Sequence, residues 1–310
     1  VRSRGLGDVY KRQIVISGNH DSAERLSFAS RILRGTGLFL CGDLYHTLAP
    51  VILKDDDGEV EFAPLPYAEP GKVREALSTD VHTHEEAERA LSDFLLRQMG
   101  HAARKIAIAH EFVAGGSASD SERPLSIGGT DLISADIFAP YNYTALGHLH
   151  GPQQAGGKEN VRYSGSLLKY SFSEAAQKKG VIVGEIDGAG QVETKFTSLA
   201  PRHEVRVIKG FFDDLIKGES EDFLMAELLD EGPVIDAMAR LRQKYPRMMT
   251  IQSHRRMNSG SGERSFDLMK KVDPLDMFRV FYKEFQDKEF TEEEENYMKE
   301  LWEDLRKEDD

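Results

Sequence analysis

Three short polar segments carry residue types that can bind metal ions or transfer protons. They are residues 18–21 (GNHD), His110 and residues 147–150 (GHLH). Imidazole nitrogens combined with carboxamide and carboxylate oxygens suit Mn(II), Fe(II) or Zn(II) better than Ca(II). Cys41 is the only cysteine, so a cage of thiolate ligands is excluded. The residue types therefore predict a divalent metal site built from histidine and oxygen ligands.

Paired metal ions would give these segments the chemistry of phosphate ester hydrolysis. Two ions can hold a bridging hydroxide, polarise a phosphoryl group and stabilise the leaving oxygen. A histidine beside the ions can donate a proton to that leaving group. Each segment also has an ordinary explanation: an Asx turn for residues 18–21, a hydrogen-bonded strand end for His110, and a surface or core pair for residues 147–150. We favour the metal site because all three segments occur, each after an apolar run.

Strands must bring the segments together, because they are far apart in the sequence. Residues 14–16, 106–109 and 144–146 are short apolar runs that predict buried strands. Strand ends on one edge of a sheet converge in space, and open α/β sheets bind their ligands there. If the third strand continues through residues 148–150, the spacing of two points both of its histidines to the same side.

Predicted helices and strands alternate to about residue 199, which indicates an α/β fold. Apolar residues at helical spacing predict helices over residues 22–33 and 83–99. Further strands are predicted at residues 38–40, 60–62 and 181–183, and a polar loop at 115–123. A small second α/β unit is predicted from strands at 203–209, 222–228 and 248–252 and a helix at 234–245.

The C-terminal part predicts a linker and two amphipathic helices. Residues 258–264 (NSGSGER) have linker composition. Asp273 before Pro274 predicts the start of one helix, and Thr291 with Glu294 predicts a capping box for the other. Their apolar stripes are Leu275, Phe278, Phe281, Phe285, Met298, Leu301, Trp302 and Leu305. Such stripes pack on the chain's own core or on a partner; we favour a partner because a linker isolates the helices and their outer faces are acidic.

Composition and charge limit the classes of protein to which this chain can belong. With 310 residues and 40% apolar residues the chain can bury a sizeable core, and no stretch approaches the roughly 20 apolar residues that cross a bilayer. No signal peptide opens the sequence, and one cysteine fits a reducing cytoplasm, so we expect a cytoplasmic protein without a membrane partner. The net charge is −13, but residues 287–310 carry −8 of it. A local basic groove that binds DNA is therefore not excluded.

The metal-binding segments, in this order, resemble motifs of the calcineurin-like metallophosphoesterases. Residues 18–21 resemble the third family motif, His110 the fourth and residues 147–150 the fifth. Within the superfamily, three further segments resemble the series of the SbcD family, the nuclease subunits of SbcCD complexes: residues 163–166 (YSGS), 170–174 (YSFSE) and 178–180 (KKG). The alternative for this series is an ordinary turn between two strands. The resemblance covers nearly everything from Ile14 onward.

The resemblance implies a domain plan and a set of site residues. It implies a metallophosphoesterase core over residues 14–199, a β-sandwich flanked by helices, then a capping domain over 200–257, a linker over 258–272 and partner-binding helices over 273–310. Two Mn(II) ions are implied, with Mg(II) as an alternative. The implied ligands are Asn19, His110 and His148 for one ion and His150 for the other. His20 is implied as the catalytic histidine that assists the leaving group, with Asp21 orienting it.

The same resemblance implies the partners and the reaction. The partners are an SbcC-type ATPase and double-stranded DNA ends and hairpins, and the assembly is a homodimer within a heterotetramer. The reaction is exonuclease and endonuclease cleavage of DNA in repair, recombination and replication. Arg123, Arg255 and Arg256 are candidate DNA contacts, with solvated surface charge as the alternative for each.

The sequence departs from the family pattern at its beginning. The first motif, Asp-x-His, and the second, Gly-Asp-x-x-Asp, would precede Gly18, and neither occurs. Asp8 is too close to Gly18, and Asp43 follows Asn19, so we assign neither a ligand role. We expect residues 1–13 to be a non-native leader on a truncated reading frame. Because the bridging carboxylate is missing, we expect weak binding of two metals and little activity.

Two other functions use the same residues differently. A small-molecule phosphodiesterase or phosphatase would share the metal ligands but would not need the aromatic C-terminal helices. A non-catalytic scaffold for DNA or a protein partner would use the apolar stripes as its functional surface. Comparing cleavage of duplex DNA with cleavage of a generic aryl phosphodiester separates the first alternative from a DNA nuclease.

Overall fold

The computed structural model describes residues 11–119, 122, 132–230 and 232–253, with single positions 278, 291, 294, 297 and 298. Its α-helices are α1 (Ala23–Leu26), α2 (Ser30–Arg34), α3 (Pro70–Leu77), α4 (His84–Gln98), α5 (Phe212–Leu215) and α6 (Ala237–Arg242). Two short 3-10 helices are η2 (Ala135–Phe138) and η3 (Phe172–Glu174). The strands β1 to β8 are Gln13–Ile16, Leu38–Cys41, Val51–Asp55, Gly58–Leu65, Lys105–His110, Phe112–Val113, Leu132–Ile133 and Tyr143–Gly147. The strands β9 to β15 are Gln153–Ala155, Lys158–Tyr163, Gly180–Ile186, Val192–Ser198, Val205–Gly210, Phe223–Leu228 and Met248–Ser253.

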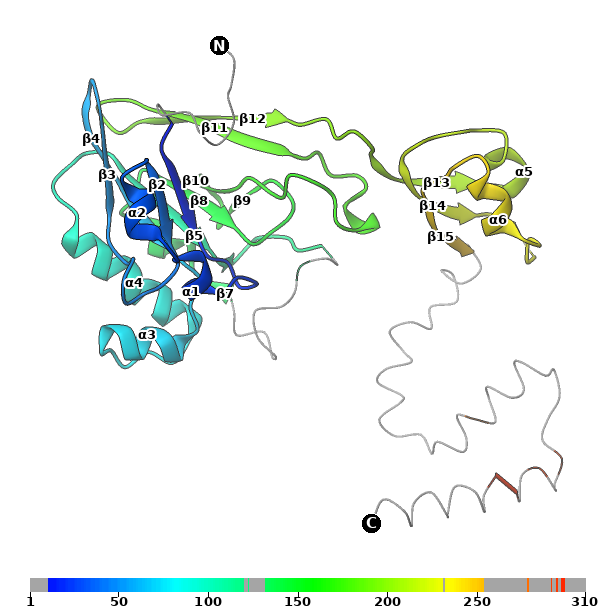
Figure 1. Ribbon diagram of the computed structural model, residues 1–310, viewed down its shortest axis with the longest axis horizontal. Coiled ribbons are helices and arrows are strands. Elements are labelled where there is room, and N and C mark those ends of the chain that lie inside the picture. The colour runs from blue at the N-terminus through cyan, green and yellow to red at the C-terminus, as the bar shows by residue number, and fades with distance from the viewer. Residues whose placement is uncertain are drawn as a thin grey trace.

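A six-stranded sheet forms the body of the molecule, which confirms the predicted mixed α/β class (Figure 1). Its strand order is β3-β4-β5-β8-β10-β9, with β4, β5, β8 and β10 parallel and the two outer strands antiparallel to their neighbours. β5 and β8 run in register, so that His110 at the end of β5 pairs with Gly147 at the end of β8. The sheet therefore brings two of the predicted metal-binding segments to the same edge.

Helix α4 covers the core of this sheet and confirms the helix predicted over residues 83–99. Thr83 and Glu86 form a capping box that satisfies the first backbone N–H groups. One face of the helix is buried, including Leu91 and Leu95, and packs with sheet residues such as Leu65. The periodicity predicted this element because apolar residues three and four apart lie on one helical face.

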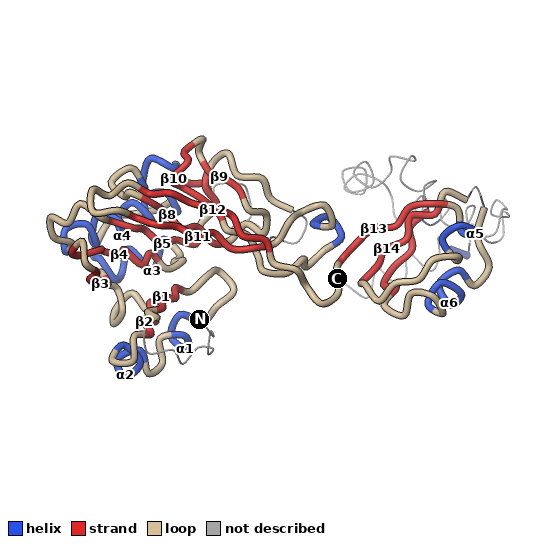
Figure 2. Tube along the Cα trace, turned by 90° about the horizontal axis from the view of Figure 1, so that it is seen from above, coloured by secondary structure: helices blue, strands red, loops and turns tan. Residues whose placement is uncertain are grey.

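Strands β1 and β2 form a separate parallel pair (Figure 2). β1 contacts β4 and β5 of the large sheet. Because β1 ends at Ile16, the segment that follows it begins beside the end of β5. Residues 18–21, the remaining predicted metal-binding segment, therefore reach the same region from a different sheet.

One predicted helix is wrong. Residues 22–33 form α1 and α2 instead of one continuous helix, because Ala29 between them adopts a left-handed backbone with φ of 61°. An L-residue in that conformation interrupts helical hydrogen bonding. Sequence periodicity does not report such a break, because Ala29 is a good helix former by type.

The small second α/β unit is confirmed. Strands β13, β14 and β15 form a parallel three-stranded sheet, and α5 and α6 pack on it. The core of this unit includes Leu224, Leu241 and Met248, each of which is almost fully buried. In Figure 1 it lies beyond the antiparallel β11–β12 hairpin. The predicted helix at 234–245 is shorter, since α6 begins after Asp236, whose φ is 51°.

Little of the predicted C-terminal segment is described. The capping box is confirmed, because Thr291 N–H donates to Glu294 Oε2 at 2.9 Å and Glu294 N–H donates to Thr291 Oγ1 at 3.3 Å. Phe278 and Met298 are helical, and Phe278 is 38% exposed. The predicted linker at 258–264 lies outside the described residues. Among the helices that the structure describes, none is long and apolar enough to cross a membrane.

Candidate metal centre

His110 occupies a slot between two glycine backbones. A Cβ added to Gly18 would lie 2.6 Å from His110 Cε1, and one added to Gly147 would lie 2.8 Å from His110 Nδ1. These separations are shorter than van der Waals contact, so only glycine leaves room for the ring at either position. Gly18 and Gly147, which begin their motifs, therefore fix the position of His110, which lies outside both motifs.

Asn19, His110 and His148 converge at this strand edge. His110 Nε2 lies 3.0 Å from Asn19 Oδ1. The rings of His110 and His148 have centroids 5.4 Å apart and meet edge to face at 74°. Two ligands at right angles, each about 2.1 Å from one cation, are about 3.0 Å apart, so the contact between Asn19 and His110 has the spacing of a shared ion as well as that of a hydrogen bond.

The surroundings of His110 favour its neutral form. Burial, and next the neighbouring His148, lower the pKa of His110 to about 4. The charge of Asp21 raises this pKa and that of His20 lowers it, both by less than burial does. Neutral imidazole is the form that binds metal ions. His110 can therefore bind a metal ion without first losing a proton.

Residues 18–21 form a tight turn. Gly18 N–H donates to Asp21 Oδ2 at 2.8 Å, and Asp21 N–H donates to Gly18 O at 3.1 Å. His20 and Asp21 are exposed, and Asn19 is half-buried. The turn aims Asn19 at His110 and leaves His20 accessible to solvent. The proton-handling role of His20 and the orienting role of Asp21 stay predictions.

The strand geometry that would point both histidines of residues 147–150 to the same side does not continue through them. β8 ends at Gly147, and His148 has φ of 100°, which L-residues rarely adopt. His148 consequently meets the His110 ring and the Phe112 ring, the latter with centroids 5.9 Å apart. His150 instead reaches a different set of partners.

His150 belongs to a charged network that sequence reasoning did not identify. Its Nδ1 lies 3.0 Å from Glu174 Oε1, and its backbone N–H donates to Glu122 Oε1 at 2.6 Å. Glu174 is fully buried, and its Oε2 lies 2.6 Å from Lys179 Nζ. The signal was present, because Glu174 ends the YSFSE segment and Lys179 lies in the KKG segment. What the sequence did not show is that they contact each other and His150.

The residue types at this strand edge are compatible with a divalent cation. One carboxamide oxygen and two imidazoles suit Mn(II), Fe(II) or Zn(II). Within the described part of the chain, no group of three or more His, Cys, Asp or Glu is placed to hold a metal ion. Asp43 is used by its own turn, where it accepts from Tyr45 N–H at 2.9 Å and contacts His46.

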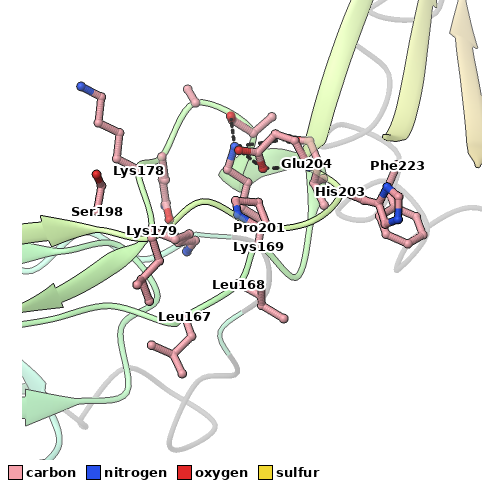
Figure 3. Close-up of a pocket in the computed structure, with 15 residues that line it drawn as sticks. Leu167, Leu168, Lys169, Lys178, Lys179, Ser198, Pro201, His203, Glu204 and Phe223 are labelled. Carbon is pink, nitrogen blue, oxygen red and sulfur yellow. Dashed lines mark hydrogen bonds and ion pairs between the residues drawn. The ribbon is translucent and has the colours of Figure 1, made fainter. Parts of the chain in front are cut away.

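A cavity of about 500 Å³ lies between the body and the small sheet (Figure 3). Lys178 and Lys179 line it from the body, and His203 and Phe223 line it from the small unit. Lys169 joins the two sides, since its Nζ pairs with Glu204 Oε1 at 3.0 Å. Lys179 therefore belongs both to the cavity wall and to the His150 network.

Several predicted residues cannot be placed. The candidate DNA contacts Arg123, Arg255 and Arg256 lie outside the described residues. So do most of the residues of the predicted partner-binding stripes: Leu275, Phe281, Phe285, Leu301, Trp302 and Leu305. Their roles stay predictions.

The fold and the site define a mixed α/β protein with a histidine and amide cluster at the edge of a mostly parallel sheet. Residues 201–285 match the family model SbcD_C, described as the type 5 capsule protein repressor C-terminal domain. The match includes all of β13 to β15 and both helices of the small unit. It supports an SbcD-like protein and suggests a subunit related to SbcCD nucleases, which act with an SbcC-type subunit.

Proposed function

We propose that this chain is the nuclease subunit of an SbcCD-type complex and serves metal-dependent hydrolysis of DNA phosphodiesters. Its substrates are double-stranded DNA ends and hairpins, and its role lies in DNA repair and recombination. Mn(II) is the proposed metal, with Mg(II) as the alternative. An SbcC-type ATPase is the proposed partner, in a heterotetramer that contains two copies of this chain.

One observation carries the proposal. Asn19, His110 and His148 come together at the strand edge of a chain whose residues 201–285 match SbcD_C. The cluster alone would support many metal-dependent reactions, and the match alone concerns only the small unit and the residues after it. Their combination favours a nuclease over other phosphoesterases on a similar scaffold.

The side chains have distinct proposed tasks. When bound, a divalent ion would polarise the phosphoryl group and lower the pKa of a bound water. Asn19 and His110 would hold one ion together with His148. His20 is exposed and follows Asn19 directly, and its proposed task is to donate a proton to the leaving oxygen. His150 would face the second ion.

DNA cleavage tests the proposal. A chain in which a family-type segment carrying Asp-x-His and Gly-Asp-x-x-Asp precedes residue 14 should cleave hairpin DNA in Mn(II). His148→Ala in the extended chain should lower cleavage by at least about 100-fold, because a metal ligand is lost. Hairpin cleavage that survives this substitution would contradict the assigned site. Faster cleavage of an aryl phosphodiester than of DNA would favour the small-molecule alternative.

A further inference from the structure

We infer that Tyr170 is a substrate-contact residue, whose exposed ring stacks on an unpaired base of DNA beside the candidate metal centre. That the substrate is DNA rests on the proposed function. The presentation of the ring rests on contacts within this chain. Tyr170 opens the segment of residues 170–174 (YSFSE), to which the proposed function gives no task.

Tyr170 is exposed next to a predicted site residue. It is 67% exposed, and its ring lies 5.4 Å from the His150 ring between centroids, at an interplanar angle of 52°. His150 follows His148 by two residues, and His148 meets the His110 ring at the strand edge. The exposed ring therefore lies close to the candidate metal centre.

The loop of residues 165–170 is anchored to the rest of the chain. Ser166 N–H donates to the carbonyl oxygen of His150 at 3.1 Å. The Lys169 side chain is only 7% exposed, and its Nζ pairs with Glu204 Oε1 at 3.0 Å. A loop held at both of these points loses little conformational entropy when a ligand binds to it.

The same loop leaves three large side chains in water. Leu167, Leu168 and Tyr170 are 57%, 53% and 67% exposed. Single exposed apolar side chains are normal, whereas neighbouring ones that a fixed backbone presents together mark a contact surface. Covering these side chains would stabilise a complex, because apolar surface would leave water.

The cavity next to the loop favours a nucleic acid strand as the occupant. Leu167 and Leu168 line this cavity with the exposed Lys178, and His203 and Phe223 line it from the small unit (Figure 3). The rings of His203 and Phe223 meet edge to face, with centroids 6.2 Å apart. Aromatic rings combined with cationic side chains are typical of sites for unpaired strands, because rings stack on bases and cations attract phosphates.

A tyrosine ring selects an unpaired base. Bases inside a duplex are already stacked on both faces, so the ring of Tyr170 can cover a base only where the strand is unpaired, as in the loop of a hairpin. Every base has a π-face, so the contact tolerates any sequence. We therefore expect Tyr170 to favour DNA with unpaired bases and to be indifferent to their identity.

Fluorescence of 2-aminopurine tests the stacking directly. The probe is a hairpin DNA with this base in its loop, bound to the 1–310 chain in EDTA so that cleavage does not occur. Stacking on an aromatic ring quenches 2-aminopurine, so we expect quenching with the unsubstituted chain and with Tyr170→Phe, and none with Tyr170→Ala. Tyr297→Ala is the matched control, since Tyr297 is 64% exposed, and it should quench like the unsubstituted chain.

Affinity gives a second readout, measured by fluorescence anisotropy. Tyr170→Ala should weaken binding of the hairpin by about 5–100-fold, which is the effect of losing one stack between a base and an aromatic ring. A duplex whose two ends are closed by non-nucleotide linkers offers no unpaired base. Its affinity should change by less than about 2-fold in the same variant.

The outcomes distinguish this inference from the proposed function. Quenching retained in Tyr170→Ala, or an equal loss of affinity for both DNAs, would overturn the stacking role and leave DNA binding intact. Normal binding of both DNAs with loss of binding to an SbcC-type subunit would make the loop a protein interface, which also overturns it. Quenching that depends on Tyr170, in a chain whose extended form cleaves no hairpin, would support the stacking role and count against the nuclease. A chain that binds neither DNA would contradict both.

Discussion

Glu174 at the site and Glu88 in the body are both buried glutamates, but their surroundings are opposite. Glu174 lies 2.6 Å from the Lys179 ammonium and 3.0 Å from the His150 ring. Glu88 lies on α4, where its side chain is buried in the core of the body. Burial raises the pKa of Glu88 to about 8, so it is mostly protonated at neutral pH.

The contrast shows that burial of an acidic group does not by itself mark a functional site. In the body, a carboxyl group is accommodated by taking a proton. Beyond the strand edge, the Glu174 carboxylate is accommodated by Lys179 and contacts the half-buried ring of His150. A charged partner that also contacts a site residue is therefore the more informative feature.

Removing Lys179 should have the largest effect on stability. Lys179→Met leaves the buried Glu174 charge without its closest cation, which should cost about 3–5 kcal/mol at pH 7. Urea unfolding measures this loss. Lys217→Met is the matched control, because Lys217 pairs with Asp214 at 71% exposure and should change stability by less than about 0.5 kcal/mol.

The double variant Glu174→Met with Lys179→Met sharpens this prediction. It should recover much of the stability lost in Lys179→Met, because no unpaired charge remains buried. Equal unfolding midpoints for Lys179→Met and Lys217→Met would contradict the claim that the buried lysine contributes more to stability than the exposed one.

Glu88 should make stability fall as pH rises. Burial raises its pKa from an ordinary value of 4.5 to about 8 in the folded protein, so between these values the folded state holds a proton that the unfolded state has released. The stability difference between wild type and Glu88→Gln should therefore fall by about 1.4 kcal/mol per pH unit across this window and be flat below it. Urea unfolding at a series of pH values gives this slope.

The pH dependence of the stability difference, and not its absolute size, tests the role of Glu88. The new side chain in Glu88→Gln or Glu88→Met changes the absolute stability by an amount of its own. Glu88→Met should remove the same slope as Glu88→Gln. A difference curve that stays level from pH 5 to pH 8 in both variants would mean that Glu88 is ionised inside the fold.

Alanine at the two slot glycines should displace His110. Gly18→Ala or Gly147→Ala places a methyl group within 2.8 Å of that ring, and overpacking of this kind costs about 1–3 kcal/mol. Thermal unfolding measures the cost, and the ring signals of His110 should shift. Gly71→Ala in α3 is the control, since nothing lies within 4 Å of its added Cβ, and it should be neutral or stabilising by about 0.5 kcal/mol. Destabilisation by Gly71→Ala of the same size would argue against a specific slot.

The sequence predicted features that depend on local pattern. Helix α4 follows from apolar spacing, and the convergence of Asn19 and His110 follows from strand ends on neighbouring elements. It did not predict the break at Ala29 or the turned backbone of His148, because tertiary contacts impose backbone conformations that residue type disfavours.

The Glu174 and Lys179 pair was hidden for a different reason. Both residues lie in segments that the sequence had singled out, but the segments loop back on each other after strand β10, and residue types do not report which charges meet. Three-dimensional contact, and not a stronger motif, was the missing information.

Paramagnetic broadening by Mn(II) tests the central claim, that the strand edge is the metal site. Mn(II) added in small steps to the labelled 1–310 chain broadens the ring signals of the histidines nearest to it. The account predicts that His110 and His148 lose their signals first, before His82 and His203, and that Asn19→Ala delays this loss. Broadening that begins at His82 or His203, or that affects all 10 histidines equally, would contradict it.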